Sequence, residues 1–192
     1  IVVAIIGVLA ALAIYGVRKY LSLSKSAEAR QNVGAIARSA VAAYTRVSAP
    51  ADLMADGTST NGEQQKLCTT SHAVPATFAL IQGRKYQPST KTAWSDFNWG
   101  SSTAGWRCLR FTISEPISYK YNYVKDFASP VYGTNVCGQN NTFYATALGD
   151  ADGNCASFNW NCVATYSRCG KVDPASKQLK LSTQLFVRNG NE

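Results

Sequence analysis

The sequence predicts an α+β protein in which a long N-terminal helix packs on an antiparallel β-sheet head with disulfides. Three observations predict it. Residues 1–17 are apolar throughout, residues 18–47 keep an apolar stripe at helical spacing, and all six cysteines lie further along, among short strand-like runs. We therefore expect two regions, an N-terminal helix over residues 1–47 and a globular head over residues 48–192.

Composition narrows the classes of protein that fit the chain. Hydrophobic residues make up 46% and charged residues 16% of its 192 residues, which is too apolar for general disorder. The chain has a single histidine, His72, which excludes a two-histidine zinc site. His72 follows Ser71 directly, and neighbours in an extended chain point to opposite faces, so these two side chains do not make a catalytic dyad. We expect no enzymatic activity.

The first segment reads IVVAIIGVLAALAIYGV and carries no charge. As a helix it spans roughly 25 Å, which is at the short end for crossing a bilayer. Because the chain starts with Ile rather than Met, we expect further apolar residues upstream to complete the span. The alternatives are a signal-peptide core and a buried core helix. No small-x-small cleavage site follows cleanly, and a helix apolar on all sides is unusual inside a domain of this size, so we favour a membrane anchor.

The next segment, residues 18–47, is amphipathic. Its apolar stripe consists of Val33, Ile36, Ala37, Ala40, Val41, Tyr44 and Val47. Ser48-Ala49-Pro50 ends the run, because proline disfavours helix in the residue before it. The stripe predicts that this half of the helix packs on the head.

Positive charge is concentrated in the same segment. Of the net charge of +8, the larger part lies between Arg18 and Arg46. Arg18, Lys19 and Lys25 come just after the apolar run, where they would meet anionic lipid head groups. Nucleic-acid binding is the alternative for a basic chain, but the sequence has no recognisable motif for it. We expect no specific nucleic-acid partner.

The head reads as short strands between turns. Residues 51–66 are polar and predict a loop. Strand-like runs occupy residues 107–113, 117–124, 143–148, 158–166 and 178–187. The short spacing between them predicts antiparallel pairing. Tyr119, Tyr121 and Tyr123 alternate within the second run, so they should face one side of the sheet and pack there.

The cysteines are Cys68, Cys108, Cys137, Cys155, Cys162 and Cys169. An even number in a loop-rich region beyond a membrane segment indicates disulfides in an oxidising compartment. The sequence has no CxxC spacing, which argues against zinc. The pairing is open from the sequence, although Cys68 and Cys108 make a reasonable pair because both precede the other four.

A second candidate site is the acidic turn formed by Asp150, Asp152 and Asn154. Their i, i+2, i+4 spacing matches part of a calcium loop, but the glycine and distal glutamate of such a loop are missing. The same side chains can accept hydrogen bonds from nearby backbone amides and so cap a turn. We favour the turn and expect no cofactor, with calcium as the weaker alternative.

These residues carry a family resemblance. The run IVVAIIGVLAALAIYGVRKY, a helical stripe and a strand-rich disulfide-bearing head together resemble the mature N-terminal region of type IV pilins and pseudopilins. The match is strongest over residues 1–13. In the head, GWRCLRFTISEPISYKYNYV and GDADGN resemble the sheet of some bacterial pilins. The family's segment starts with a methylated aromatic residue followed by a stretch with a glutamate, which we expect upstream of Ile1.

The resemblance implies the pilin fold and a role as the subunit of a type IV pilus, an extracellular filament for adhesion or twitching motility. It implies assembly from the bacterial inner membrane by pilus machinery, through self-association of the helix. The residues that the resemblance places in the membrane and then in the filament core are Ile1, Val2, Val3, Ile5, Ile6, Gly7, Leu9, Ala10, Ala11, Leu12, Ala13, Ile14 and Tyr15.

The chain departs from the family pattern at Tyr15, where many members have proline. Members often lose helical turns in the filament between a glycine matching Gly7 and that proline. Here Gly7 and Gly16 are the expected melting points, and glycine weakens a helix less than proline does. Two alternatives stay open: a pseudopilin of a type II secretion system, and a monomeric membrane-anchored binding module.

Overall fold

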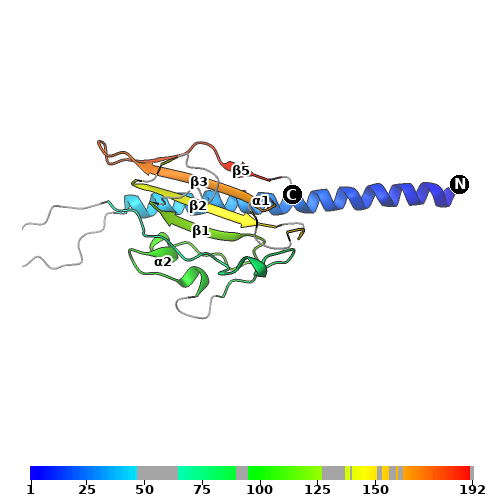
Figure 1. The fold of residues 1–192 in the computed structure, drawn as a ribbon, viewed down its shortest axis with the longest axis horizontal. Helices are drawn as coiled ribbons and strands as arrows, with labels where there is room; N and C mark the ends of the chain where they lie inside the picture. The colour runs from blue at the N-terminus through cyan, green and yellow to red at the C-terminus, as the bar shows by residue number, and fades with distance from the viewer. Residues whose placement is uncertain are drawn as a thin grey trace, which may run out of the picture.

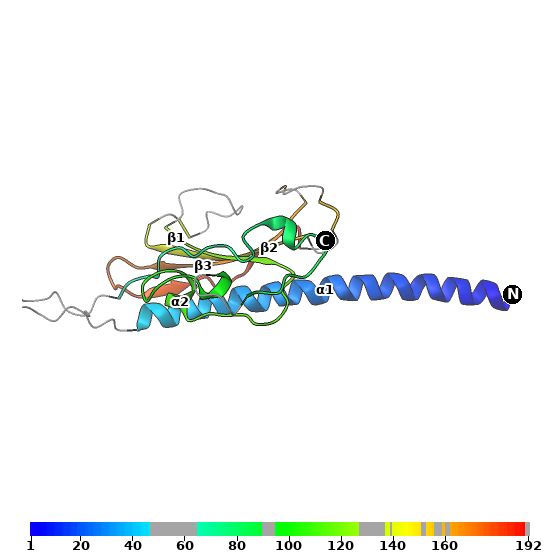
Figure 2. The ribbon, with the colours of Figure 1, turned by 90° about the horizontal axis from the view of Figure 1, so that it is seen from below.

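The computed structural model describes residues 1–46, 65–89, 95–126, 137–138, 140–150, 153–155, 159 and 162–190. Helix α1 (Val2–Thr45) lies along one face of a β-sheet, and its N-terminal half projects beyond the head as a single rod (Figure 1). Viewed from the side, the helix forms one layer and the sheet a second (Figure 2). This α+β arrangement is the one that the sequence predicts.

The sheet has five antiparallel strands. They are β1 (Lys120–Lys125), β2 (Thr142–Gly149), β3 (Ala164–Val172), β4 (Leu179–Leu181) and β5 (Phe186–Arg188). The strands β1, β2 and β3 are neighbours in that order, and β3 then pairs with β5 along its first half and with β4 along its second half. Two 3-10 turns, η1 (Phe78–Leu80) and η2 (Asp96–Asn98), and a short helix α2 (Gly105–Leu109) complete the described elements.

The core lies between α1 and the sheet. On the helix it begins at Ser26 and continues through the fully buried Val33, Ile36 and Ala37 to Tyr44. The predicted stripe is therefore largely confirmed, although Val41 is only half-buried and Val47 lies outside the described residues.

The sheet's side of this core combines aromatic and small residues. Tyr119, Tyr121 and Tyr123 are all buried in it, as predicted, and so are Phe143 and Tyr166. In β2, Ala145 and Ala147 are fully buried and belong to the same cluster as the helix stripe. Small side chains on the central strand let the helix backbone come close, while the rings fill the space on either side.

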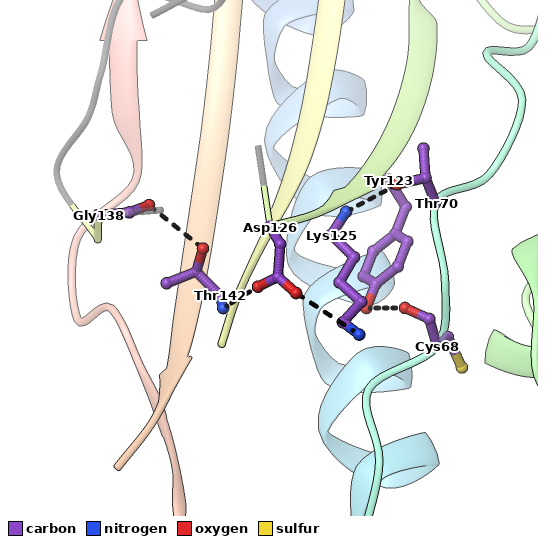
Figure 3. Close-up of polar contacts among 7 residues, drawn as sticks. All are labelled: Cys68, Thr70, Tyr123, Lys125, Asp126, Gly138 and Thr142. Atoms are coloured by element: carbon purple, nitrogen blue, oxygen red, sulfur yellow. Dashed lines mark hydrogen bonds and ion pairs between the residues drawn. The ribbon is translucent and has the colours of Figure 1, made fainter. Parts of the chain in front are cut away.

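The outer edge of β1 is covered by the chain that precedes η1. Val74 and Tyr121 exchange two backbone hydrogen bonds of 2.9 and 2.7 Å. Further along, the Lys125 amide donates to Thr70 Oγ1 at 3.1 Å, and the Tyr123 hydroxyl donates to the Cys68 carbonyl at 3.2 Å (Figure 3). Covering this edge removes a row of backbone groups that would otherwise be open to pairing with another strand.

Side chains also tie the end of β1 to the start of β2. The Thr142 amide donates to Asp126 Oδ1 at 2.9 Å, and Lys125 Nζ lies 3.5 Å from Asp126 Oδ2 (Figure 3). Thr142 Oγ1 in turn donates to the Gly138 carbonyl at 3.2 Å.

All six cysteines form disulfides, which confirms the expectation from their number and position. The bonds are Cys68–Cys108, Cys137–Cys169 and Cys155–Cys162. The first is the pair that we suggested from the sequence. It links the segment along the edge of β1 to α2. The second fastens the chain before β2 to β3.

One predicted strand is wrong, and two others are right only in part. Residues 107–113 include most of α2 instead of a strand, because Trp106 and Leu109 are one helical turn apart and both are buried. Periodicity does not separate the two structures over so short an apolar run. Residues 178–187 divide into β4 and β5, because the Ser182 amide bonds to the Cys169 carbonyl and the chain then turns to the other half of β3. The predicted run 158–166 is a strand from Ala164 onward, and residues 156–158, 160 and 161 lie outside the described residues.

The buried tyrosines predict alkaline unfolding. Burial raises the pKa of Tyr119, Tyr121 and Tyr123 above 10.0, and the charge of Asp126 adds to the rise at Tyr123. Above pH ~10 the unfolded chain loses these protons first, so the free energy of unfolding should fall by up to ~1.4 kcal/mol per pH unit for each tyrosine. Urea unfolding midpoints measured from neutral pH to well above pH ~10, the ordinary pKa of tyrosine, test this expectation.

Tyr123→Phe is the variant that separates this effect from general alkaline damage. At neutral pH it removes one hydrogen bond, to the Cys68 carbonyl, at a cost of about 1 kcal/mol. Above pH ~10 its stability should decline less steeply than that of the wild-type chain, because one titrating group is gone. Equal slopes for the two proteins would contradict the assignment to Tyr123.

Candidate membrane and assembly surface

The projecting part of α1 carries nearly all of the exposed large hydrophobic side chains in the described chain. Only Leu80 and Val187 lie elsewhere. The rest are Ile1, Val2, Val3, Ile5, Ile6, Val8, Leu9, Leu12, Ile14, Tyr15, Val17, Tyr20, Leu21 and Leu23. A soluble monomer rarely exposes so large a continuous apolar surface, which makes this segment a candidate for contact with a membrane or with other protein chains.

The projection is about as long as the hydrocarbon core of a membrane is thick. Continuous burial against the head begins at Ser26, so about 25 residues extend beyond it, or roughly 35 Å of helix. By length and composition α1 can cross a bilayer, and none of the apolar window is buried within the chain. Because none of this window is buried within the described chain, the buried-core-helix alternative is excluded. A signal sequence near an N-terminus would pass the same test of length and composition.

Every predicted membrane and filament residue from Ile1 to Tyr15 lies on this projection and is exposed. The structure brings none of them against the head. The helix is continuous through Gly7 and Gly16, the two expected melting points, and a methyl group added at either glycine would meet no atom within 4 Å. The small residues Ala10, Ala11 and Ala13 are open to a neighbouring helix in the same way.

A polar cluster holds α1 in place where it leaves the head. The Ser118 amide donates to Glu28 Oε1 at 3.0 Å, and the Tyr121 hydroxyl donates to the same oxygen at 3.2 Å. Asn32 Nδ2 donates to the Tyr121 hydroxyl oxygen at 2.8 Å. The sequence analysis above assigned no role to Glu28. The signal was available, because Glu28 and Asn32 are one helical turn apart and so lie on one face.

Two further contacts fix the other end of the helix. The Tyr44 hydroxyl donates to the Lys177 carbonyl at 2.7 Å, and Arg46 Nη2 donates to the Cys108 carbonyl at 2.6 Å. Between the two ends, the guanidinium of Arg30 lies 5.7 Å from the centre of the Tyr166 ring. These polar contacts at both ends fix the position of the buried part of α1 along its axis, and the helix continues from there without a break into the projecting segment.

The acidic turn is organised by one carboxylate. Asp150 is fully buried, and its Oδ1 accepts hydrogen bonds from the amides of Gly153 and Asn154 at 2.7 and 3.1 Å. Its Oδ2 accepts a third from the amide of Cys155 at 3.1 Å. Asp150 thus caps the turn, as the favoured interpretation expects. Asp152 lies outside the described residues, and the described part of the chain contains no group of three potential metal-ligating side chains.

Ser71 and His72, the pair considered as a catalytic dyad, have separate surroundings. Ser71 Oγ accepts from the Tyr123 amide at 3.0 Å, while the His72 ring stacks on Trp99 with their centres 3.8 Å apart.

Comparisons with protein-family models, curated proteins and solved structures found no match to this chain. The functional argument therefore depends on the geometry of the projecting helix and on the sequence pattern of its residues.

The capping role of Asp150 leads to a test of the acidic turn. Asp150→Asn should lower the free energy of unfolding by about 1–3 kcal/mol, because buried amides lose a charged acceptor. Asp173→Asn is the comparison variant, since Asp173 accepts from the amides of Ala175 and Ser176, and from Lys180 Nζ at 2.8 Å, in a turn that is largely exposed. The control should change stability much less. Urea unfolding of the three proteins measures the difference, and equal losses would contradict the importance of burial at Asp150.

The same turn should not respond to calcium. A ligand at 100 times its Kd stabilises the folded state by about 2.7 kcal/mol, which raises the Tm by several degrees for a chain of this size. We expect the same Tm with calcium and with chelator. A calcium-dependent rise that is lost in Asp152→Ala would overturn the turn interpretation.

Proposed function

We propose that this chain is the structural subunit of a type IV pilus, a helical extracellular filament that polymerises through the projecting half of α1. The observation that carries the proposal is a projecting helix of about 25 residues, apolar throughout residues 1–17, that takes no part in the head's core. The resemblance of its sequence to type IV pilins supports the same assignment.

Physical chemistry allows such a rod two stable environments. One is the hydrocarbon core of a bilayer, and the other is a bundle of identical helices from which water is excluded. The small residues Gly7, Ala10, Ala11 and Ala13 favour the bundle, because they let helices approach closely. A repeated contact between unlike surfaces that does not close into a ring produces a helical filament. The membrane would then store subunits, and the filament would be their destination.

The remaining features support a head outside the cytoplasm. Three disulfides in a small head are typical of an oxidising compartment. The basic residues Lys19 and Lys25 follow the apolar run, where lipid head groups would lie. We propose insertion in the bacterial inner membrane first, followed by extraction into the filament by pilus assembly machinery. Adhesion and twitching-type motility are the roles that such a filament would support.

A structural role without catalysis agrees with the surroundings of Ser71 and His72. The hydroxyl of Ser71 is used by the backbone of Tyr123, and the ring of His72 packs on an aromatic side chain. Neither group is placed to activate the other.

Electron microscopy of material sheared from cells that express the whole protein tests the proposal. Long filaments containing the chain would support a pilus subunit. Short filaments confined to the cell envelope would favour the pseudopilin alternative. A chain that stays monomeric after release from the membrane would favour the anchored binding module and contradict polymerisation.

Ala11→Asp makes the filament prediction specific to the projecting helix. It would place an unpaired charge in the filament core or near the middle of a bilayer, which costs about 3 kcal/mol or more. We expect filaments to be absent, as scored by microscopy and by the amount of sheared protein. Ala11→Ser keeps a small uncharged residue at the same place and should still assemble.

A second control separates assembly from the stability of the head. Ala175→Asp adds the same charge at an exposed turn at the other end of the molecule, and filaments should persist. Immunoblots of membrane fractions show whether each variant accumulates. Normal filaments from Ala11→Asp would show that the projecting helix is not the core of the polymer.

A further inference from the structure

The stretch of α1 between the apolar run and the head, residues 17–26, has two unlike faces. Side chains four or seven residues apart share a face of a helix, so each position can be related to the part of α1 that the head buries. Ser22 is four residues before the buried Ser26 and seven before the buried Ala29, so it lies on the side that faces the head. Leu23 is four residues before Ala27, which is exposed on the side away from the head.

The side away from the head is apolar in this stretch. Val17, Tyr20 and Leu23 follow one another at intervals of three residues, and their exposed fractions are 58, 72 and 57%. Tyr20 is seven residues before Ala27 and Leu23 is four before it, so this line continues onto the outer surface of the helix beside the head. There the surface becomes small and polar, at Ala27 and Gln31.

The side that faces the head is polar in the same stretch. It carries Ser22 and Lys25, each one helical turn before residues that the head buries. Lys19 and Leu21 lie on the two flanks, one polar and one apolar. The last apolar side chain on the side that faces the head is Tyr15, which is seven residues before Ser22.

The apolar surface of α1 therefore ends at different heights on its two sides. It ends at Tyr15 toward the head and at Leu23 away from the head, and between these two residues the helix rises by roughly 12 Å. With its side chains a helix is itself ~10–12 Å wide, so a flat boundary between hydrocarbon and water meets both ends only if the helix leans by roughly 45°. Tilts of membrane helices average ~20° and reach ~40°, so the pattern corresponds to a lean near the upper limit.

Lipid is the environment that this surface fits. The face formed by Val17, Tyr20 and Leu23 is continuous with the apolar residues 1–17, which are exposed on all sides. A tyrosine ring and a lysine side chain such as that of Lys19 are typical of the boundary between hydrocarbon and head groups. A second helix packs closely against small residues, whereas all three of these side chains are large.

We propose that α1 lies slanted in the membrane, with Tyr20 and Leu23 in the lipid and Ser22 on the side that faces water. This inference rests on the proposed membrane anchoring of residues 1–17 and is independent of filament assembly. The sheet lies along one side of α1 (Figure 2), and that is the side of Ser22. The slant therefore places the head on the upper side of the helix and keeps the sheet away from the lipid surface.

Spin labels on the full chain in phosphatidylcholine vesicles measure the slant. The native cysteines are all in disulfides, so an introduced cysteine is the only free thiol. Labels at Ser22→Cys and Ser24→Cys are compared by their accessibility to dissolved oxygen and to a water-soluble nickel chelate, because the ratio of the two reports depth. Ser24 is three residues before Ala27 and seven before Gln31, so it lies on the side away from the head.

The two orientations of the helix predict opposite orders of depth. In an upright helix the label at Ser24 would lie roughly 3 Å closer to water than the label at Ser22, because it is farther along the axis. In the slanted helix we expect Ser24 to lie roughly 5 Å deeper than Ser22, because the width of the helix outweighs that rise.

Paired variants attribute the slant to the apolar side chains. Tyr20→Ser with Leu23→Ser removes them from the side away from the head and should restore the upright order, with Ser24 as the shallower label. Leu80→Ser with Val187→Ser makes the same kind of change at the exposed large hydrophobic residues of the head and should leave the slanted order unchanged.

A third label, at Ala11→Cys, separates this proposal from the anchoring on which it rests. A deep label at Ala11, with Ser24 shallower than Ser22, would overturn the slant and leave the anchoring in place. A label at Ala11 that is open to the nickel chelate would overturn the anchoring and the slant with it. Magnetic broadening of the Ser24 label that grows with the ratio of protein to lipid would assign this face to a second copy of the chain and overturn its contact with lipid.

Discussion

The structure depends on the packing of one face of α1 against the tyrosine-rich face of the sheet. Ala29, Val33, Ile36 and Ala37 are completely buried there. The buried rings of Tyr119, Tyr121 and Tyr123 belong to the same core cluster, and large buried aromatic side chains dominate the energetics of such cores. The head is small and its sheet has two very short strands, so without this helix the sheet would expose its apolar face to water. The same helix that completes the core therefore also carries the projecting segment.

Polar contacts turn this packing into a fixed geometry. Apolar packing alone tolerates small shifts along a helix, because it is not directional. The Glu28 contacts to Ser118 and Tyr121 at one end, and the Tyr44 contact to Lys177 at the other, are directional. A rigid angle between head and rod matters for a helical polymer, since a small variation in each subunit would accumulate along the filament.

The periodicity of the sequence predicted the long helix, β1 and β2, because each has a sustained pattern that a single packing partner explains. Of β3 it predicted only residues 164–166. It failed at α2, where five residues with buried Trp106, Cys108 and Leu109 satisfy a strand pattern and a helical turn equally. It missed Glu28, because the partners of that carboxylate are 90 and 93 residues away in the chain. For the candidate site, the apolar run of residues 1–17 predicted the projecting segment. Its end near Ser26 could not be predicted, because it depends on where the head begins to cover the helix.

The division of α1 has a consequence for the change of environment that the proposed assembly would require. Residues 1–17 make no contribution to the head's core, whereas residues from Ser26 onward do. Transfer of the rod from lipid to a helix bundle exchanges one apolar environment for another and leaves the core of the head untouched. In the proposed assembly the head would need no refolding, and its disulfides would not have to open. Because apolar burial is gained in both environments, the balance between them rests on helix packing around small residues such as Gly7 and Ala11, and on the charges next to the membrane surface.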